Sequence, residues 1–118
     1  MERESLPLLG PNALVREAVV LLAERRGIVV VTDETCQLLG VLTVGDFTRL
    51  VERSADPLAA PLREVMTATP RTARAGELGG AVVHRMQQHG IIAMPVLDDA
   101  ERIVGVVHLH DLMRAGCA

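Results

Sequence analysis

Aromatic side chains are almost absent from this sequence, which has no tryptophan, no tyrosine and a single phenylalanine, Phe47. Nearly half of its 118 residues are nonetheless apolar, so its core must consist of aliphatic side chains and methionine. That length suffices for one domain with a sizeable core, but is short for two independent ones. A single aromatic ring cannot form a platform on which successive bases stack, so single-strand nucleic-acid binding loses its usual chemistry.

Basic blocks and long apolar runs are missing as well. The formal net charge is −3 and the arginines are thinly spread, which disfavours duplex DNA and anionic membranes as partners. The longest apolar stretches, residues 19–23 and 29–31, fall far short of the roughly 20 residues that span a bilayer. We therefore expect neither a nucleic-acid partner nor a membrane partner.

Cysteine is equally scarce. Cys36 and Cys117 are too few for a disulfide framework, and the N-terminus does not resemble a secretory signal. A reducing, cytoplasmic environment is therefore expected.

Patterns typical of catalysis or metal binding are absent too. No nucleophile has an evident base, and neither a Gly-rich phosphate loop nor an HExxH string occurs. His108 and His110 lie two apart at the end of a predicted strand, without a clear third ligand. His84 and His89, five apart on a predicted helix, do not share one tight face. We expect no catalytic residues, no metal and no required cofactor.

The most informative feature present is an internal repeat. Gly40 leads through apolar residues to Asp46, and 65 residues later Gly105 leads in the same way to Asp111. Each copy predicts a strand, a four-residue turn ending in Asp, and a short apolar helix. Duplication in so short a chain indicates one domain of two halves, with both Asp-bearing turns facing a shared cleft.

Both halves predict the order helix, strand, turn, strand, helix. In the first half we expect a helix over 13–26 capped by Asn12 and Gly27, strands over 28–32 and 38–43, and a turn at 33–35. The second half predicts a helical stripe of Leu78, Ala81, Val82, Met86 and His89, strands over 92–97 and 103–108, and a turn at 98–100.

Overlaying the halves pairs Ala18 with Ala81 and Gly27 with Gly90, which leaves two extra residues between Gly90 and the following turn. Between the halves, an Asp-Pro pair at 56–57 predicts a short linker helix within residues 58–66, with Pro61 limiting its regularity.

The duplicated unit resembles a tandem pair of CBS domains, often called a Bateman module. The resemblance rests on residues 40–46 and 105–111, on the segment 91–98 and on the linker string 64–67. It implies an α/β (α+β) fold in which two β-α-β-β-α repeats pack about a pseudo-two-fold axis. Residues 1–55 would form repeat 1, 56–66 the linker helix and 67–118 repeat 2.

A narrower resemblance is to the C-terminal CBS pair of the arabinose-5-phosphate isomerase family, enzymes that feed synthesis of the lipopolysaccharide sugar acid Kdo. Residues 6–8, 43–46 and 108–116 carry it, whereas Val44, Gly79 and Gly80 depart from the family pattern. In that family a sugar-isomerase domain precedes the CBS pair. The resemblance therefore implies such a domain in the parent protein.

In CBS domains the Asp of each turn binds the two ribose hydroxyls, and the residue three positions earlier lies near phosphate. The resemblance gives these roles to Asp46 and Asp111, and to Thr43 and His108. A carboxylate can accept two hydroxyl hydrogens, and a helix N-terminus favours a nearby anion. Further ligand contacts are expected from Ile92, Ala93, Met94, Pro95, Thr69, Arg71, Val29 and Val30.

The same residues allow purely structural interpretations. Thr43 and Asp46 match a capping box, which stabilises a helix without binding anything. His108 is a poor N-cap, so the second copy favours a ligand, and a single nucleotide is expected first beside Asp111. Pro95, which has no N–H, predicts a strand edge or irregularity that either exposes backbone groups to a base or prevents aggregation.

Three functions remain open at this point. The leading one is a regulatory module that senses a nucleotide or nucleotide sugar, with CMP-Kdo, AMP or ATP as candidates, and controls an attached sugar-phosphate isomerase domain. The second is a structural module that forms a homodimer through its CBS helices without a ligand. The third is a freestanding adapter that acts on a partner in trans.

Overall fold

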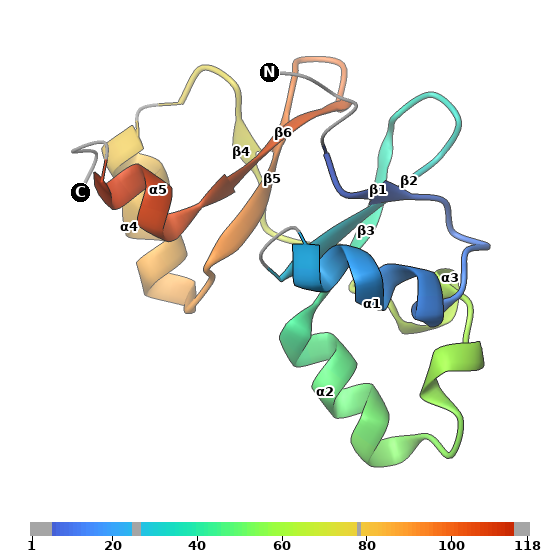
Figure 1. Ribbon diagram of the computed structural model, residues 1–118. Coiled ribbons are helices and arrows are strands. Elements are labelled where there is room, and N and C mark those ends of the chain that lie inside the picture. Colours follow the sequence, from blue (N-terminus) through green and yellow to red (C-terminus); the bar gives the residue numbers. More distant parts are fainter. Residues whose placement is uncertain (1–5, 25–26, 78, 115–118) are drawn as a thin grey trace.

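Two copies of a β-α-β-β-α unit follow one another in the computed structural model, which describes residues 6–24, 27–77 and 79–114. Repeat 1 comprises β1 (Leu8–Leu9), α1 (Val15–Glu24), β2 (Ile28–Thr32), β3 (Leu38–Thr43) and α2 (Val44–Arg53). Repeat 2 comprises β4 (Ala73–Arg74), α4 (Gly79–His89), β5 (Ala93–Leu97), β6 (Ile103–His108) and α5 (Leu109–Arg114). Between them lie the 3₁₀ helix η2 (Pro57–Ala59) and α3 (Leu62–Val65), as Figure 1 shows.

The two repeats form separate three-stranded sheets, β1-β2-β3 and β4-β5-β6, with the same strand register. Ile28 lies opposite Thr43, and Ala93 lies opposite His108. In both sheets the register shifts just before the hairpin loop. The predicted strands at 28–32, 38–43 and 103–108 are confirmed, whereas β5 begins one residue later than expected because Ile92 lies in a bend.

Alternation along the strands divides the core into layers. Val29 and Val31 of β2 pack on the helix side of their sheet, while Ile28 and Val30 pack against the other repeat. In β5, Met94 faces its own helices in the same way. Successive side chains of a strand point to opposite faces. An uninterrupted apolar strand is therefore buried on both sides, with helices outside and the two sheets facing each other about a pseudo-two-fold axis.

The hairpin loops of the two repeats have the same structure. The Asp33 carboxylate accepts backbone N–H groups two and four residues later, at 2.8 and 3.0 Å, and Asp98 does the same at the same distances. Cys36 and Glu101, at equivalent positions, both adopt a left-handed backbone, with φ of 66° and 65°. The Thr35 hydroxyl lowers the pKa of Asp33, and the Arg102 N–H lowers the pKa of Asp98. These carboxylates hold turns together.

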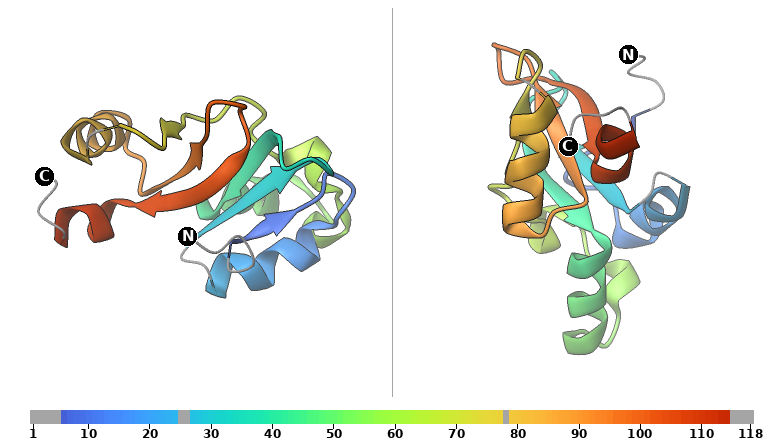
Figure 2. Two further views of the ribbon diagram at one scale, coloured as in Figure 1. Left: turned by 90° about the horizontal axis from the view of Figure 1, so that it is seen from above. Right: turned by 90° about the vertical axis from the view of Figure 1, so that its left-hand side faces the viewer.

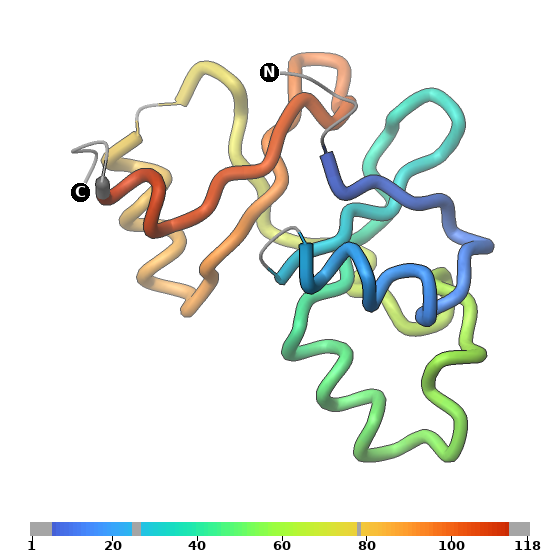
Figure 3. The backbone as a smooth tube through the Cα atoms, viewed as in Figure 1, coloured from blue at the N-terminus to red at the C-terminus, as the bar shows by residue number. Residues whose placement is uncertain are grey.

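The loops also bond to each other, which joins the repeats at one end. Ile103 donates its N–H to the Cys36 carbonyl at 3.0 Å, and the Gln37 side chain donates to the Ala100 carbonyl at 2.9 Å. Figure 3 shows both loops at the same end of the molecule. The strand ends away from these loops are the start of β2, the end of β3 and the start of β5.

The predicted start of α1 is wrong. The helix begins at Val15, and Glu17 in its first turn accepts the Leu14 N–H at 2.8 Å. The expected cap, Asn12, instead accepts a hydrogen bond from Arg63 at 2.6 Å. An acid three residues inside a helix can satisfy the N-cap amide, and Glu17 supplies it here.

The overlay of the two first helices is shifted by one residue. Gly27 donates its N–H to Leu22, and the equivalent bond in repeat 2 comes from Ile91 rather than Gly90. Accordingly, Ala18 is buried whereas Ala81 is exposed. One extra residue, rather than two, therefore lies between α4 and β5. The predicted helix end at 25–26 and the stripe residue Leu78 lie outside the described residues.

The linker is broken and returns to repeat 1. The short helix predicted within residues 58–66 is present as α3, and it is separated at Pro61 from the 3₁₀ helix η2. Thr67 then pairs with Val41 through two backbone bonds of 2.8 and 3.0 Å. A Cβ on Gly40 would lie 2.6 Å from the Thr67 carbonyl, so this approach requires glycine. Figure 2 shows α2 extending away from both sheets.

Candidate functional site

Two adjoining cavities lie between the repeats, at the strand ends opposite the hairpin loops. The inner cavity, of about 170 Å³, is lined by Ile28, Val41, Thr43, Asp46, Thr67, Pro70, Arg71, Ile91, Ala93 and Pro95. The outer cavity, of about 490 Å³, shares three of these residues and is otherwise lined by Gly27, Val44, Gly45, Arg49, His89, Gly90 and Ile92. Repeat 1, the linker and repeat 2 all contribute walls.

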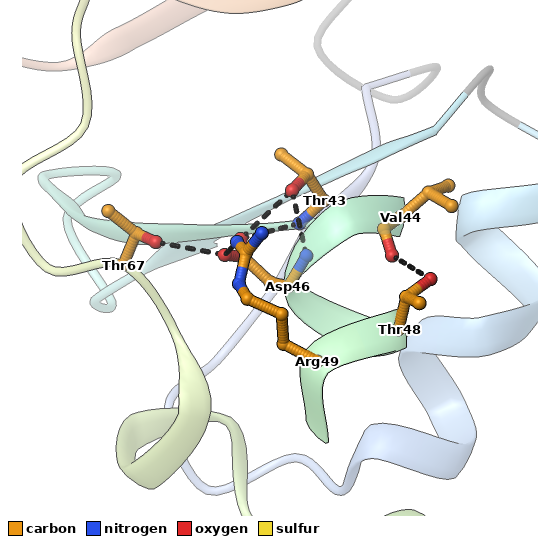
Figure 4. Close-up of polar contacts among 6 residues, drawn as sticks. All are labelled: Thr43, Val44, Asp46, Thr48, Arg49 and Thr67. Carbon is orange, nitrogen blue, oxygen red and sulfur yellow. Dashed lines mark hydrogen bonds and ion pairs between the residues drawn. The ribbon is translucent and has the colours of Figure 1, made fainter. Parts of the chain in front are cut away.

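Asp46 is the acidic residue of the inner cavity, and both of its carboxylate oxygens accept hydrogen bonds (Figure 4). Oδ2 accepts the backbone N–H and the hydroxyl of Thr43, both at 3.0 Å. Oδ1 accepts Arg49 Nη2 at 2.6 Å and the Thr67 hydroxyl at 3.3 Å. Only 12% of the Asp46 side chain is exposed.

The capping-box interpretation of Thr43 and Asp46 is confirmed. Asp46 returns a bond from its own N–H to the Thr43 hydroxyl at 3.2 Å, which completes the reciprocal pair. Because α2 begins at Val44, Asp46 is the third helical residue, whereas the sequence pattern had placed it at the end of a turn before the helix. The cap and a ligand role are compatible, since the side chain also borders the cavity.

The second copy has a different geometry. Asp111 is again the third residue of its helix, and its Oδ2 lies 3.9 Å from Nδ1 of His108. Neither residue lines the inner or the outer cavity. The described cavities therefore favour Asp46 over the expected first position beside Asp111.

Comparison with known proteins identifies the family. The model of the CBS domain matches residues 2–53 and 62–117. The chain belongs to the CBS domain family. This CBS pair is 36% identical over 115 residues to arabinose 5-phosphate isomerase KdsD of Pseudomonas aeruginosa, a match that covers 96% of this chain and 35% of that protein. The KdsD of Salmonella typhi is 31% identical over 114 residues, covering 96% and 34%. The CBS pair thus spans about a third of the length of these curated relatives.

A solved structure has the same arrangement. The CBS domain pair of protein MJ0100, in complex with 5′-methylthioadenosine and S-adenosyl-L-methionine, matches with a TM-score of 0.81 and 26% identity. The match covers 94% of this chain and 87% of that chain.

The CBS pair brings together several of the residues expected to contact a ligand. Ala93 and Pro95 line the inner cavity on the side of repeat 2, and Arg71 lines it from the linker. Ile92 borders the outer cavity and is 59% exposed. Together with Thr43 and Asp46, the three that line the inner cavity make up half of its lining.

Four other expected contact residues lie away from the inner cavity. Val29 and Met94 are fully buried on the helix sides of their sheets, because they alternate with the residues that face the other repeat. Val30 is buried between the sheets without lining either cavity. Thr69 is exposed and lines neither cavity. The threonine that lines the inner cavity is Thr67.

Pro95 lies in the central strand of its sheet rather than in an edge strand, at a point where β4 does not pair with it. It is fully buried and lies opposite Val106. Its equivalent in repeat 1, Val30, donates its N–H to Pro7 at 2.8 Å, a bond that Pro95 cannot make. The neighbouring strand β4 starts pairing only at Ala73, opposite the next residue. Proline is tolerated at position 95 because β4 is too short to need a bond from it. Pro70 and Arg71, which precede β4, line the inner cavity instead.

Among the side chains that bond to Asp46, two were not recognised in the sequence as ligand candidates. Arg49 carries a detectable signal, because its spacing of three from Asp46 on a helix favours an ion pair. Thr67 carries no such signal, because it meets Asp46 only through the returning linker.

Two further observations concern metal binding and membrane insertion in the described part of the chain. Within residues 6–24, 27–77 and 79–114, no three His, Cys, Asp or Glu side chains come close enough to hold a metal ion. None of the helices in those ranges is both long and apolar enough to cross a bilayer.

Proposed function

We propose that this CBS pair is a regulatory module that senses a nucleotide or nucleotide sugar in the cavity beside Asp46 and thereby controls an attached sugar-phosphate isomerase domain. The observation that carries this proposal is the inner cavity, where the Asp46 carboxylate meets apolar walls from both repeats. A ligand held there contacts both repeats, so its binding can bias their arrangement through differential affinity.

The chemistry of the cavity suits a nucleoside. Ile28, Ala93 and Pro95 offer apolar surface to a base, and the Asp46 carboxylate can accept the hydroxyls of a ribose. At about 170 Å³, the inner cavity is smaller than the roughly 300–1,000 Å³ of typical ligand sites. A nucleotide would therefore place its base and part of its ribose there, and extend into the outer cavity.

The comparisons support both parts of the proposal. The related MJ0100 pair was solved with two adenosine derivatives, which favours an adenosine-type or other ribose-containing effector. Similarity to KdsD proteins, of which this CBS pair matches about a third, favours a sugar-phosphate isomerase as the controlled domain. AMP, ATP and CMP-Kdo are the candidate effectors, and CMP-Kdo combines ribose, phosphate and carboxylate in one molecule.

Titration calorimetry with AMP, ATP, CMP and CMP-Kdo tests this function, with Asp46→Ala and Asp111→Ala as a matched pair. Asp46→Ala should weaken binding at least about tenfold, because it removes an acceptor for hydroxyl groups. Asp111→Ala should change the affinity less than about threefold. Circular dichroism checks that both variants are folded. Loss of affinity in Asp111→Ala alone would move the site to the second copy, and failure of all four nucleotides to bind would refute the sensor function.

A second candidate function is homodimerisation through the helices. Val44 and Val51 of α2 are 51% and 49% exposed, on a helix that extends away from both sheets (Figure 1). Val44 and Val51 are seven residues apart and therefore share one face of α2, which a second copy of the helix can cover. Light scattering after size-exclusion chromatography tests this, because Val51→Glu should convert a dimer into a monomer. A wild-type monomer at all concentrations would exclude it.

A further inference from the structure

The Asp46 carboxylate has no spare capacity in this structure. A carboxylate offers about four acceptor positions, and Asp46 uses them for two bonds from Thr43, one from Arg49 and one from Thr67. A diol can therefore bind only if an existing donor leaves. The Thr43 bonds form the cap of α2, whereas the Arg49 side chain is 67% exposed and belongs to a long flexible residue. The Thr67 bond, at 3.3 Å, is the longest of the four, and its loss frees one position on Oδ1. Arg49, which is bonded to the same oxygen, must free the other when both hydroxyls of a diol bind.

The outer cavity is where a displaced Arg49 would remain. Arg49 lines it, and its guanidinium lies over the backbone of Gly45, where a Cβ would be 3.4 Å from Nη1. His89, from the end of α4 in repeat 2, lines the same cavity. Once Asp46 binds a diol, the guanidinium loses its carboxylate partner inside a cavity that holds a second basic side chain. An anion would restore its pairing, and guanidinium groups bind phosphate and carboxylate with two parallel bonds.

We infer that the outer cavity is the anion compartment of the effector site. Arg49 exchanges the Asp46 carboxylate for the anionic group of the effector when the diol binds, and His89 contacts the same group from repeat 2. This inference rests on the proposed function and adds to it the residues that select a phosphorylated effector over its nucleoside. It also makes the anion a bridge between the repeats.

Titration of the full chain with AMP and adenosine, and with CMP and cytidine, tests the inference. The wild type should bind the nucleotide of at least one pair about tenfold more tightly than the nucleoside, because a charge-assisted pair is lost without phosphate. Arg49→Gln should reduce the nucleotide affinity to the level of the nucleoside. Nucleoside affinity should stay equal or rise, since Asp46 is released from its ion pair. His89→Gln should reduce the nucleotide preference by a smaller factor.

Two further variants sharpen the test. Arg53→Gln, on the last turn of the same helix, is the matched control and should leave both affinities unchanged. Gly45→Ala places a methyl group between Arg49 and Thr43 and should weaken the nucleotide more than the nucleoside, while favouring the helical state.

The possible outcomes separate this inference from the proposed function. Equal affinity for nucleotide and nucleoside in the wild type would overturn the anion compartment and leave the nucleoside site intact. An equal loss of both affinities in Arg49→Gln would also overturn it, because Arg49 would then only position Asp46. If no nucleoside and no nucleotide binds, the proposed function fails, and this inference fails with it.

Discussion

The two repeats have the same backbone design but different chemistry at the start of their last helices. In repeat 1, Thr43 and Asp46 form a reciprocal cap beside a cavity, and Arg49 and Thr67 complete the shell of the carboxylate. In repeat 2, His108 lies 3.9 Å from Asp111, and neither residue borders that cavity. The two repeats thus share the register of their strands, while the side chains at the starts of their last helices differ.

Repeat 2 contributes to the inner cavity even though its own Asp111 does not border it. Repeat 2 supplies Ala93, Pro95 and Ile91 to the wall of a cavity whose carboxylate belongs to repeat 1. A site shared in this way responds to the relative position of the repeats, which a site within either repeat would not.

The largest effect is expected from the equivalent buried residues Met94 and Val29. Met94→Ala should lower the free energy of unfolding by about 2–5 kcal/mol, and Val29→Ala by less, because it removes fewer atoms. Both side chains face the helices, so the affinity for nucleotides should change less than about twofold. Urea unfolding and calorimetry measure the two quantities. A folded Met94→Ala protein with lost affinity would restore Met94 to the ligand site.

Gly40 offers the next largest effect, because it lets the linker dock on repeat 1. Gly40→Ala should lower the free energy of unfolding by about 1–3 kcal/mol, since its Cβ would clash with the Thr67 carbonyl and the Met66 sulfur. Gly10→Ala is the control, because a Cβ at that position would meet nothing within 4 Å, and should change stability by less than about 0.5 kcal/mol. Similar urea midpoints for both variants would contradict the docking role.

The two helix starts can be made more alike or more different. Thr43→Ala should cost about 1 kcal/mol, because it removes the cap of α2. His108→Thr should stabilise repeat 2 by up to about 1 kcal/mol, because threonine and Asp111 could then form the same reciprocal pair. Thermal unfolding measures both changes. Destabilisation by His108→Thr would show that the histidine has a structural role that threonine cannot replace.

The smallest effect concerns an ion pair in repeat 2 that repeat 1 cannot form. Its arginine, Arg85, is equivalent to Leu21 of repeat 1. Arg85 pairs with Glu77, and the bond from Arg85, followed by the Arg74 N–H, lowers the pKa of Glu77. A lowered folded-state pKa stabilises the protein above the ordinary glutamate range, and this contribution is lost as the pH falls through the folded-state value. Both side chains are partly exposed, so the contribution is about 0.5–1 kcal/mol.

Urea unfolding at pH 7 and pH 3.5 tests the ion pair. Glu77→Gln should destabilise the protein at pH 7 and destabilise it less at pH 3.5, below the ordinary glutamate pKa. Asp33 of repeat 1 and Asp98 of repeat 2 also have lowered pKa values. Both remain in the variant, so the protein still loses some stability in acid. An equal effect of Glu77→Gln at both pH values would contradict the electrostatic explanation.

Most of the fold could be predicted because the repeated pattern and the β-branched strands are strong local signals. The strands β1 and β4 could not be located, because two residues show no periodicity. The cap at Asn12 was plausible by residue type, yet Glu17 satisfies the same backbone group from inside the helix. The preference of asparagine for the N-cap position was therefore outweighed by the hydrogen bond from the Leu14 N–H to Glu17.

The site was only partly predictable, for reasons of geometry. Motif position identified Thr43, Asp46 and Pro95, whereas taking whole strand segments as contacts also included Met94, which alternates to the other face. Thr67 and His89 reach their places through the linker and through the other repeat. Contacts of that kind depend on how the repeats pack, which a single sequence does not display.

The bonded hairpin loops have a mechanical consequence. Because Ile103 and Gln37 bond the repeats together at one end, a rotation of one repeat against the other would pivot there, and displacement would grow with distance from that pivot. The cavity end therefore has the greatest leverage. A small change in the gap around Asp46 would be magnified further out along α2, which extends beyond both sheets (Figure 2).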